Sequence, residues 1–170
     1  MTTGGFTSAG LRQEEQLLQL NSLGHSDALQ IGEIALALAK SEALAISIEV
    51  RLIVDSDGAK PTMWTVFHYA LPGALPDQPS WISRKANVVL ATGHSTIYER
   101  VLAEESSLDW YEEHGLSEVD HAIHGGGIPL NVAGSGLQGI LLISGLPQVE
   151  DHLFAVRVLT QFLARQGELL

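Results

Sequence analysis

The stretch "HGGGIPLNVAGSGLQGILLIS", residues 124–144, decides the fold that the sequence predicts. Two apolar runs, residues 128–133 and 137–144, lie on either side of the segment "GSG". Apolar runs punctuated by glycine are typical of a β-hairpin. The three glycines before the first run predict a tight entry into its strand, with a positive φ at one or more of them. The stretch therefore predicts two antiparallel strands.

A second hairpin is predicted upstream, where the hydrophobic period is two. Residues 46–54 alternate as a half-buried strand does, and "MWTVFHYAL", residues 63–71, reads as its antiparallel partner after the turn at 55–62. The remaining periodic segments suit helices. These are residues 11–20, 27–41 with Asp27 as the N-cap, 81–91, an acidic region at 96–116, and 148–165.

The resulting order, ααββααββα, predicts an α+β domain with four or five antiparallel strands and helices on the faces of the sheet. The length of 170 residues and the 45% hydrophobic content suit one globular domain over residues 1–170. Its core is expected at residues 27–166. Residues 1–26 are expected to form a tail, a short helix and a loop.

The charge of the chain excludes several classes of partner. The formal net charge is −11 with nine Lys and Arg residues, so we expect no nucleic-acid partner and no electrostatic hold on membranes. Without cysteine the chain has no disulfide and no thiolate metal site. The N-terminus lacks the pattern of a secretion signal, and the apolar runs are too short to span a bilayer. A cytoplasmic location is expected.

The glycine cluster does not match a nucleotide-binding loop. Such a loop follows a strand and opens a helix, whereas here the glycines precede a strand, and no Lys-Ser or Lys-Thr pair follows them. The backbone at Gly125, Gly126 and Gly127 can still approach an anionic ligand closely. The alternative is a tight turn without a ligand.

Four histidines are the candidate ligands for a metal or a haem iron. His121 and His124 would share one face if their segment were helical, and His94 and His152 lie at predicted helix ends. Asp151 completes the candidate metal set. No familiar spacing such as His-Glu-x-x-His occurs, so the alternative is that each histidine makes a separate hydrogen bond at a loop or a subunit boundary.

Arg84 and Lys85 form the one adjacent basic pair in this acidic chain. They are candidates to meet an anionic group of a ligand or an acidic neighbouring subunit, and a solvated helix face is the alternative. Ser95 and Ser144 do not lie in a Gly-x-Ser-x-Gly motif, which leaves a serine hydrolase with little support.

Three segments, in the order in which they follow one another along the chain, resemble the haem-degrading, HbpS-like domain family. This family includes GlcG-type proteins and the C-terminal domain of PduO-type proteins. The segments are "RKANVVLATGHS" at 84–95, "HGGGIPLNV" at 124–132 and "GLQGILLISGLPQVEDH" at 136–152. The resemblance covers roughly residues 27–163 and is nearest the uncharacterised cytosolic branch of the family. It implies a profilin-like, three-layer α/β/α arrangement, assembly into a homo-oligomer, and an association with haem.

Three functional hypotheses follow from the residues and the resemblance. The first is a cytosolic, homo-oligomeric protein that binds haem or a related anionic small molecule. In it His124, His121 or His94 contacts the ligand, and Lys85 and Arg84 pair with its carboxylates. The second is a structural or protein-interaction role without catalysis, and the third is a metal-assisted enzyme with a His/Asp cluster. Enzymatic turnover stays open, and binding without turnover is the preferred expectation.

Overall fold

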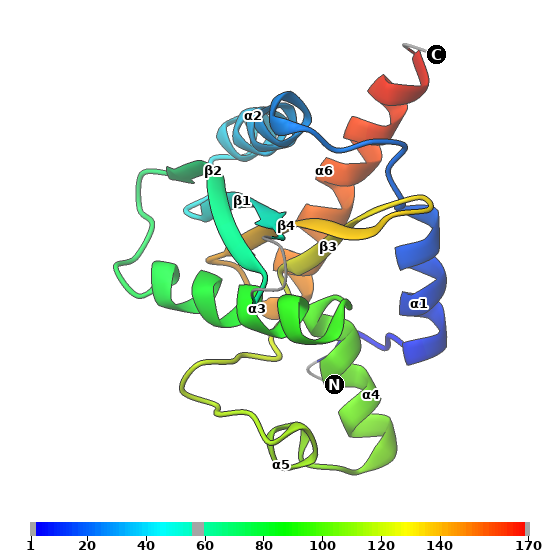
Figure 1. Cartoon of the computed structure of the whole chain (residues 1–170). Coiled ribbons are helices and arrows are strands. Elements are labelled where there is room, and N and C mark those ends of the chain that lie inside the picture. Colours follow the sequence, from blue (N-terminus) through cyan, green and yellow to red (C-terminus); the bar gives the residue numbers. More distant parts are fainter. Residues whose placement is uncertain (1–2, 56–59, 169–170) are drawn as a thin grey trace.

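A computed structural model of the chain describes residues 3–55 and 60–168. Figure 1 shows the helices and strands in chain order. They are α1 (Ser8–Leu17), α2 (His25–Ser41), β1 (Ser47–Val54), β2 (Thr62–Ala70), α3 (Gln78–Thr92), α4 (Thr96–Ser106), α5 (Trp110–His114), β3 (Gly127–Val132), β4 (Gly136–Ser144) and α6 (Gln148–Glu168). Among these described helices, none is long and apolar enough to span a lipid bilayer.

The four strands form one antiparallel sheet with the order β2-β1-β4-β3, which confirms the predicted fold class. Each predicted hairpin is present, as β1–β2 and as β3–β4. The two hairpins join because β1 pairs with β4 from Ser47↔Ser144 to Leu52↔Gly139. This pairing connects segments far apart in sequence and places β1 and β4 at the centre of the sheet.

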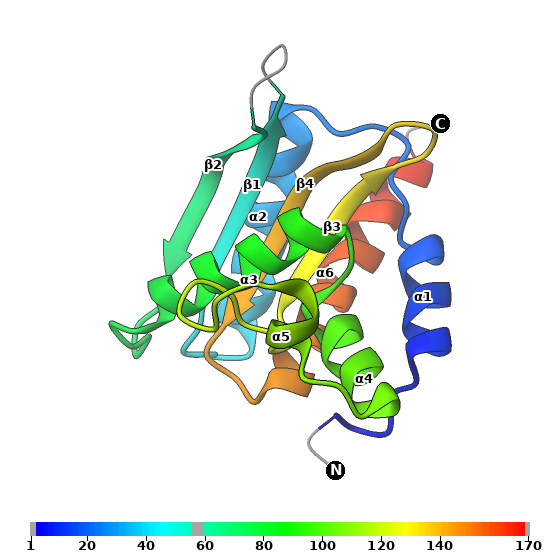
Figure 2. The ribbon, with the colours of Figure 1, turned by 60° about the horizontal axis from the view of Figure 1, so that its bottom comes forward.

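Helices cover both faces of the sheet and produce the three-layer α/β/α arrangement (Figures 1 and 2). The helices α2 and α6 lie on one face, and α3 lies on the other. Consecutive residues of β4 therefore pack in opposite directions. Leu141 and Ile143 join the core under α2 and α6, whereas Ile140 and Leu142 join the core under α3. Burial on both faces explains the unbroken apolar run "ILLI" in this strand.

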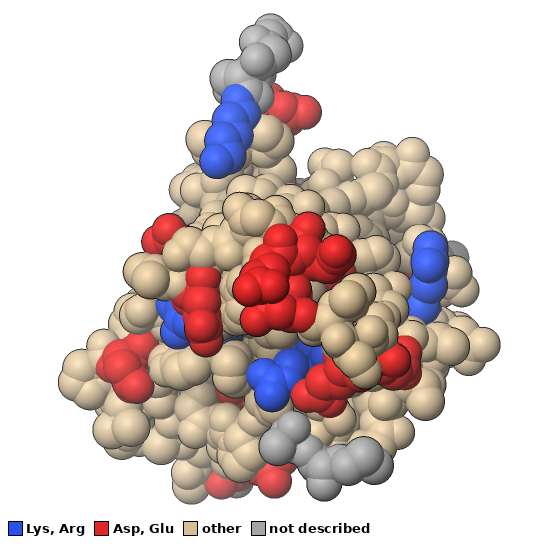
Figure 3. Space-filling model, turned by 90° about the horizontal axis from the view of Figure 1, so that it is seen from below, with Lys and Arg blue, Asp and Glu red and all other residues tan. Residues whose placement is uncertain are grey.

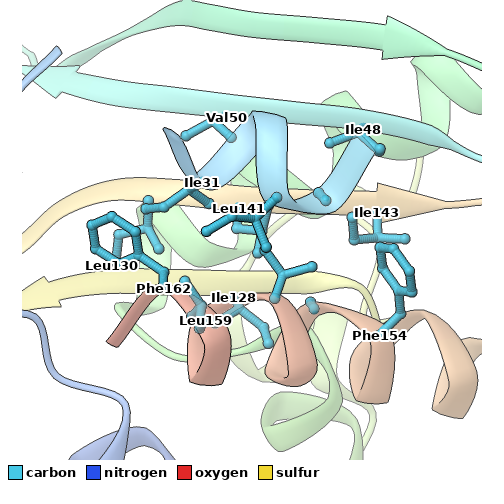
Figure 4. Close-up of a cluster of buried hydrophobic side chains, with 14 of the residues drawn as sticks. Ile31, Ile48, Val50, Ile128, Leu130, Leu141, Ile143, Phe154, Leu159 and Phe162 are labelled. Atoms are coloured by element: carbon cyan, nitrogen blue, oxygen red, sulfur yellow. The ribbon is translucent and has the colours of Figure 1, made fainter. Parts of the chain in front are cut away.

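The larger core lies between the sheet and the helices α2 and α6 (Figure 4). Ile31 of α2 and Phe162 of α6 are fully buried there against the strands. Removing an aliphatic or aromatic side chain of this size from water contributes about 1.5–3 kcal/mol. The core therefore fixes α2 and α6 on the sheet, and with α6 the position of its first turn.

Residues 3–26 pack on the rest of the fold instead of forming a free tail. The Leu20 backbone exchanges two hydrogen bonds with the β3 end, from its N–H to Asn131 O at 2.8 Å and from the Ala133 N–H to Leu20 O at 2.9 Å. Leu11 of α1 is buried with Ile97 and Val101 of α4. The short helix expected in this region is present as α1, and it packs on the same fold as residues 27–166.

Several predicted element boundaries were wrong. The acidic region 96–116 contains two helices, because Ser107 adopts a left-handed φ of 52° that ends α4, and Asp109 then caps α5. Helix α2 begins at His25, and its N-cap is Gly24. Asp27 is the third residue of the helix, and its carboxylate accepts a hydrogen bond from the Gly24 N–H at 2.7 Å.

Two further expectations concern loops. Residues 121–126 are not helical, so the shared helical face of His121 and His124 that a helix would have produced does not exist. The turn predicted at 55–62 lies partly outside the described residues.

Helix α3 begins at Gln78, three residues before the predicted start, with Pro79 in its first turn.

Gly126 enters β3 with a φ of +120°, as the glycine cluster predicted. A Cβ at this position would lie 2.3 Å from the Ile143 carbonyl oxygen and 2.9 Å from Lys85 Nζ. The carbonyl of Gly126 also accepts a hydrogen bond from the Ile143 N–H at 2.9 Å. Glycine is therefore required here both by the backbone angle and by the close approach of two neighbouring groups.

We expect Gly126→Ala to lower the free energy of unfolding by about 3 kcal/mol or more, since the new methyl group adds a steric overlap to the strained backbone angle. Gly134→Ala is the matched control. Gly134 also has a positive φ, of +80°, but within the described part of the chain no neighbouring atom lies within 4 Å of the point that a Cβ there would occupy. The control substitution should lower the free energy of unfolding by only about 1–2 kcal/mol. Urea unfolding measures both values, and equal losses would contradict the close approach at Gly126.

Candidate functional site

A pocket of about 230 Å³ lies where α3, the end of β4, the loop before β3 and the first turn of α6 meet. It is open to solvent on one side and contains both polar and aromatic side chains. Six of its lining residues carry the chemistry discussed below, namely Gln78, Trp81, Lys85, His124, Ser144 and Asp151.

Lys85 reaches this pocket because it lies on the buried face of α3. Ile82 and Val89, at spacings of three and four residues, pack on the sheet from the same face. The Lys85 side chain is 3% exposed, and its Nζ donates to the Ile143 carbonyl oxygen at 2.9 Å and to Asp151 Oδ2 at 3.1 Å. The alternative of a solvated helix face was wrong for this residue.

Asp151 lies in the first turn of α6 and is as deeply buried as its partner. Its Oδ1 accepts a hydrogen bond from the Leu146 N–H at 2.9 Å, which fixes the carboxylate in place. Burial lowers the pKa of Lys85 against the opposing charge of Asp151. Burial likewise raises the pKa of Asp151 against the opposing charge of Lys85. Desolvation therefore acts on both members of this ion pair.

His124 lines the same pocket from the loop before β3. Its ring contacts the Trp81 ring edge-on, with 4.9 Å between the centroids, and the Arg84 guanidinium lies 4.7 Å from the Trp81 centroid. Burial, together with the positive charges of Arg100, Lys85 and Arg84, lowers the pKa of His124 to about 4. The imidazole is therefore neutral at pH 7. Its buried Nδ1 has no hydrogen-bond partner in the described part of the chain.

Trp81 and Gln78 line the pocket but are absent from the candidates predicted from the sequence, and Ser144 was weighed there only as a hydrolase nucleophile. Gln78 is buried, and it accepts a hydrogen bond from Ser47 Oγ at 2.7 Å. Helical spacing could have identified two of them, because positions 78, 81 and 85 share one face of a helix. The predicted helix began at Trp81, which left Gln78 outside it.

The other candidate histidines lie away from the pocket. His94 Nδ1 is 2.8 Å from Glu15 Oε2, and this carboxylate raises the pKa of His94. His152 is 1% exposed, and its Nε2 lies 2.6 Å from Glu14 Oε1. His121 Nδ1 lies 3.0 Å from the Ser117 carbonyl oxygen.

The candidate metal ligands thus do not form one cluster, because His94, His121 and His152 each contact a different neighbour. Residues 3–55 and 60–168 contain no group of three or more His, Asp or Glu side chains placed to hold a metal ion. Of that set, the structure brings together His124 and Asp151, which line one pocket. The Arg84 guanidinium contacts the loop between α5 and β3, where it donates a hydrogen bond to the Glu118 carbonyl oxygen at 2.7 Å.

The glycines beside His124 pack closely on the chain itself. The Gly127 N–H donates to Thr96 Oγ1 at 3.0 Å, and the Gly125 N–H donates to Gln148 Oε1 at 3.4 Å. A Cβ on Gly125 would lie 2.0 Å from the Gln148 carbonyl oxygen. The glycine cluster therefore lets the loop approach α6 and places His124 at the pocket.

We expect Asp151→Asn to lower the free energy of unfolding by about 3–5 kcal/mol, because it leaves the Lys85 ammonium buried without its counter-charge. Adding Lys85→Met should recover part of this loss, since the unpaired charge is then removed. Glu150→Gln, at the exposed neighbouring position, is the control. Urea unfolding measures all three variants, and a loss for Asp151→Asn no larger than the control's would contradict the pairing.

We also expect His124 to make folding depend on pH. Its folded pKa of about 4 lies below the ordinary value of 6.5, so between these values the unfolded chain binds the proton more readily. This contribution to stability is complete above pH 6.5 and is lost as the pH falls toward 4. His124→Gln should flatten the fall in unfolding free energy between pH 7 and pH 5, by on the order of 1 kcal/mol for this partly exposed ring. His121→Gln should keep the wild-type slope, and identical slopes in all three proteins would contradict the assignment.

Comparison with known proteins identifies relatives over nearly the whole chain. Residues 23–160 match the model of the family described as haem degrading protein, HbpS-like. A UPF0303 protein of Rhizobium johnstonii is 36% identical over 160 residues, which are 94% of this chain and 93% of the relative. A UPF0303 protein of Serratia proteamaculans is 36% identical over 156 residues, which are 90% of this chain and 89% of the relative.

Solved structures share the fold. The crystal structure of the Ybr137w protein superimposes with a TM-score of 0.78 and 25% identity, and covers 92% of this chain and 88% of its own. The crystal structure of a PduOC:heme complex has a TM-score of 0.61 and 22% identity, with coverage of 82% and 94%. HbpS itself gives a TM-score of 0.57 and 21% identity, with coverage of 85% and 92%.

The family match covers the segments that carried the resemblance in the sequence and includes all but the ends of the fold. The resemblance is thereby confirmed. The chain is a member of the HbpS-like haem-degrading protein family and of the UPF0303 proteins.

Proposed function

We propose that the protein binds a small anionic molecule in the pocket between α3, β4 and α6, and that haem is the candidate ligand. One observation carries the proposal. The pocket brings together the Lys85 amine, the neutral His124 imidazole and the Trp81 ring in a chain whose net charge is −11.

The local potential at His124 favours an anion, and the rest of the pocket lining carries the Asp77 and Asp151 carboxylates beside Lys85. Arg100, Lys85 and Arg84 each lower the pKa of His124, so the field of these cations reaches the imidazole. Acidic residues form the larger patches on the face seen in Figure 3, and Lys and Arg side chains form small separate groups among them. A site with positive potential in such a chain selects a carboxylate-bearing ligand over a neutral one.

Lys85 supplies a specific contact for a ligand carboxylate. An ammonium has three N–H donors, and hydrogen bonds to Ile143 and Asp151 use two of them within the described residues. The third donor is available for a ligand oxygen. A charge-assisted hydrogen bond of this kind contributes about 1.5–3 kcal/mol.

His124 and Trp81 favour a ligand with a flat, metal-containing part. Neutral imidazole is the form that binds iron, and the Nδ1 without a partner among the described residues shows that this part of the chain does not use both ring nitrogens. The Trp81 ring offers a surface on which a planar ligand can stack. A protein of the same fold, PduOC, is known as a heme complex, which supports haem as the candidate.

The size of the pocket limits how a ligand fits. Its volume of about 230 Å³ is below the roughly 300–1,000 Å³ of typical small-molecule sites. The pocket therefore admits one carboxylate-bearing edge of a haem, with the rest of the macrocycle outside, or a smaller carboxylate as a whole.

Self-association and a cytosolic location belong to the proposal as expectations from the family resemblance. The edge strand β2 supports self-association, because its outer side pairs with no other described strand and Trp64 on it is 51% exposed. The alternative of a metal-assisted enzyme has no supporting cluster of three ligands in the described residues.

The test is a titration with hemin at pH 7, where His124 is neutral. We expect a shift of the Soret band with about one hemin per chain for the wild-type protein, because a ring nitrogen of His124 binds the iron. His124→Ala should remove the shift. Lys85→Met should keep the shift and weaken binding about ten- to a hundredfold, since it removes one charge-assisted hydrogen bond.

His121→Ala is the matched control, because His121 lies three residues from His124 in the same loop but outside the pocket. This variant should show the same Soret shift with hemin as the wild-type protein. An absent Soret shift in the wild-type protein, or a shift that His124→Ala leaves unchanged, would contradict haem binding at this site.

A further inference from the structure

The burial of Lys85 is not explained by anion binding alone. The chain has three lysines, and Lys40 and Lys60 are exposed, as lysines usually are. Lys85 is 3% exposed and lines the pocket. An exposed lysine or arginine at the rim would attract an anion without the cost of burying an ammonium. Burial suits a lysine that acts as a nucleophile.

The neighbours of Lys85 hold its amine at a fixed point. The Ile143 carbonyl oxygen and Asp151 Oδ2 contact Nζ from β4 and from α6. Gly126 lies so close that a Cβ there would be 2.9 Å from Nζ. The amine is therefore positioned by three different segments, and a reacting group that enters the pocket meets it in one orientation.

Asp151 is placed to move protons at this amine. Its Oδ2 lies 3.1 Å from Nζ, within hydrogen-bond reach, and the Leu146 N–H holds Oδ1. Burial lowers the pKa of Lys85 and raises the pKa of Asp151, and both shifts favour transfer of a proton from the amine to the carboxylate. A neutral amine with a lone pair is the reactive form.

We infer that Lys85 forms a Schiff base with the carbonyl group of a small oxo-acid bound in the pocket. The inference rests on the proposed function in one respect, because the pocket must admit an anionic ligand. An oxo-acid combines a carboxylate, which the positive potential near His124 attracts, with a carbonyl carbon that an amine attacks.

The reaction balances in atoms and charge. After proton transfer to Asp151, the Lys85 lone pair forms a C–N bond to the carbonyl carbon as the C=O π electrons move to oxygen, and a proton passes from this nitrogen to the oxygen to give a neutral carbinolamine. The hydroxyl group then leaves as water with the proton from Asp151, and a protonated imine remains. Overall, one ammonium and one carbonyl give one iminium ion and one water. The positive charge on nitrogen is kept, so the Asp151 carboxylate pairs with the product as it does with the ammonium.

The experiment traps the imine by reduction. The wild-type protein is incubated at pH 7 with pyruvate and sodium cyanoborohydride, and the product is examined by intact mass and by peptide mapping. We expect one reduced pyruvate adduct per chain, located on Lys85. Peptide mapping of the wild-type protein finds the site without any variant, so the result does not depend on how a variant folds.

Variants test the roles of the two residues. Lys85→Arg keeps the positive charge but lacks a reactive amine, and it should form no adduct at α3. Lys40→Arg, at an exposed lysine, should react as the wild type does. Asp151→Asn should slow adduct formation roughly a hundredfold, because it removes the group that accepts and returns the proton. Near-ultraviolet circular dichroism confirms that each variant is folded.

Lactate separates this inference from the proposed function, since it has the carboxylate of pyruvate but no carbonyl group. Calorimetry should show that lactate binds the wild-type protein and that it slows trapping of pyruvate. Lactate binding without an adduct on Lys85, or adducts spread equally over Lys40, Lys60 and Lys85, would overturn the Schiff base and leave anion binding intact. Absence of binding by lactate, pyruvate and hemin would overturn both.

Discussion

The hydrogen-bonded contact of Lys85 with Asp151 and the Ile143 carbonyl joins the three layers of this fold at one buried point. Lys85 comes from α3 on one face of the sheet, Ile143 comes from β4 within it, and Asp151 comes from α6 on the other face. Burying two charges is costly, and the cost is offset only when the pair and its hydrogen bonds are complete. The position of each layer is therefore constrained by the other two.

The glycine at position 126 follows from this constraint. The loop before β3 passes directly beside the ion pair, and a Cβ on Gly126 would overlap both the Ile143 carbonyl and the Lys85 amine. The same loop carries His124 to the edge of the pocket, against Trp81 of α3. Packing around one polar contact thus places an amine, a carboxylate and a neutral imidazole around one small opening.

This arrangement connects the stability of the fold to its proposed chemistry. The amine and the carboxylate that hold the layers together also line the proposed ligand pocket, so a ligand that bonded to Lys85 would replace or add to a structural contact. The family match gives the fold and a family described as haem degrading, and haem is the ligand that we propose from it, whereas a small oxo-acid is inferred at the Lys85 amine. Both assignments use the pocket, and they differ in whether iron binds His124 or carbon binds Lys85.

Local sequence patterns determined most of the secondary structure and the class of the fold. The period-two alternation of residues 46–54 and the glycine-punctuated runs of residues 124–144 predicted both hairpins, because side chains on a strand alternate between its faces. The three motifs at 84–95, 124–132 and 136–152 indicated the family. The first residue of α3 was predicted three positions too late, since Gln78 and Pro79 follow a proline- and glycine-rich loop that hides the helical period.

The site itself was decided by the tertiary structure. The sequence marked Lys85, Asp151 and His124 as candidates together with His94, His121 and His152, which the fold places in separate contacts. Residues 85 and 151 are 66 positions apart, and their meeting depends on the pairing of β1 with β4 and on the helices packed on opposite faces. Sequence by itself determined which short segments become strands and helices, because those preferences are local. The convergence of the pocket residues required the whole packed sheet, because long-range contacts and burial arise only when the layers assemble.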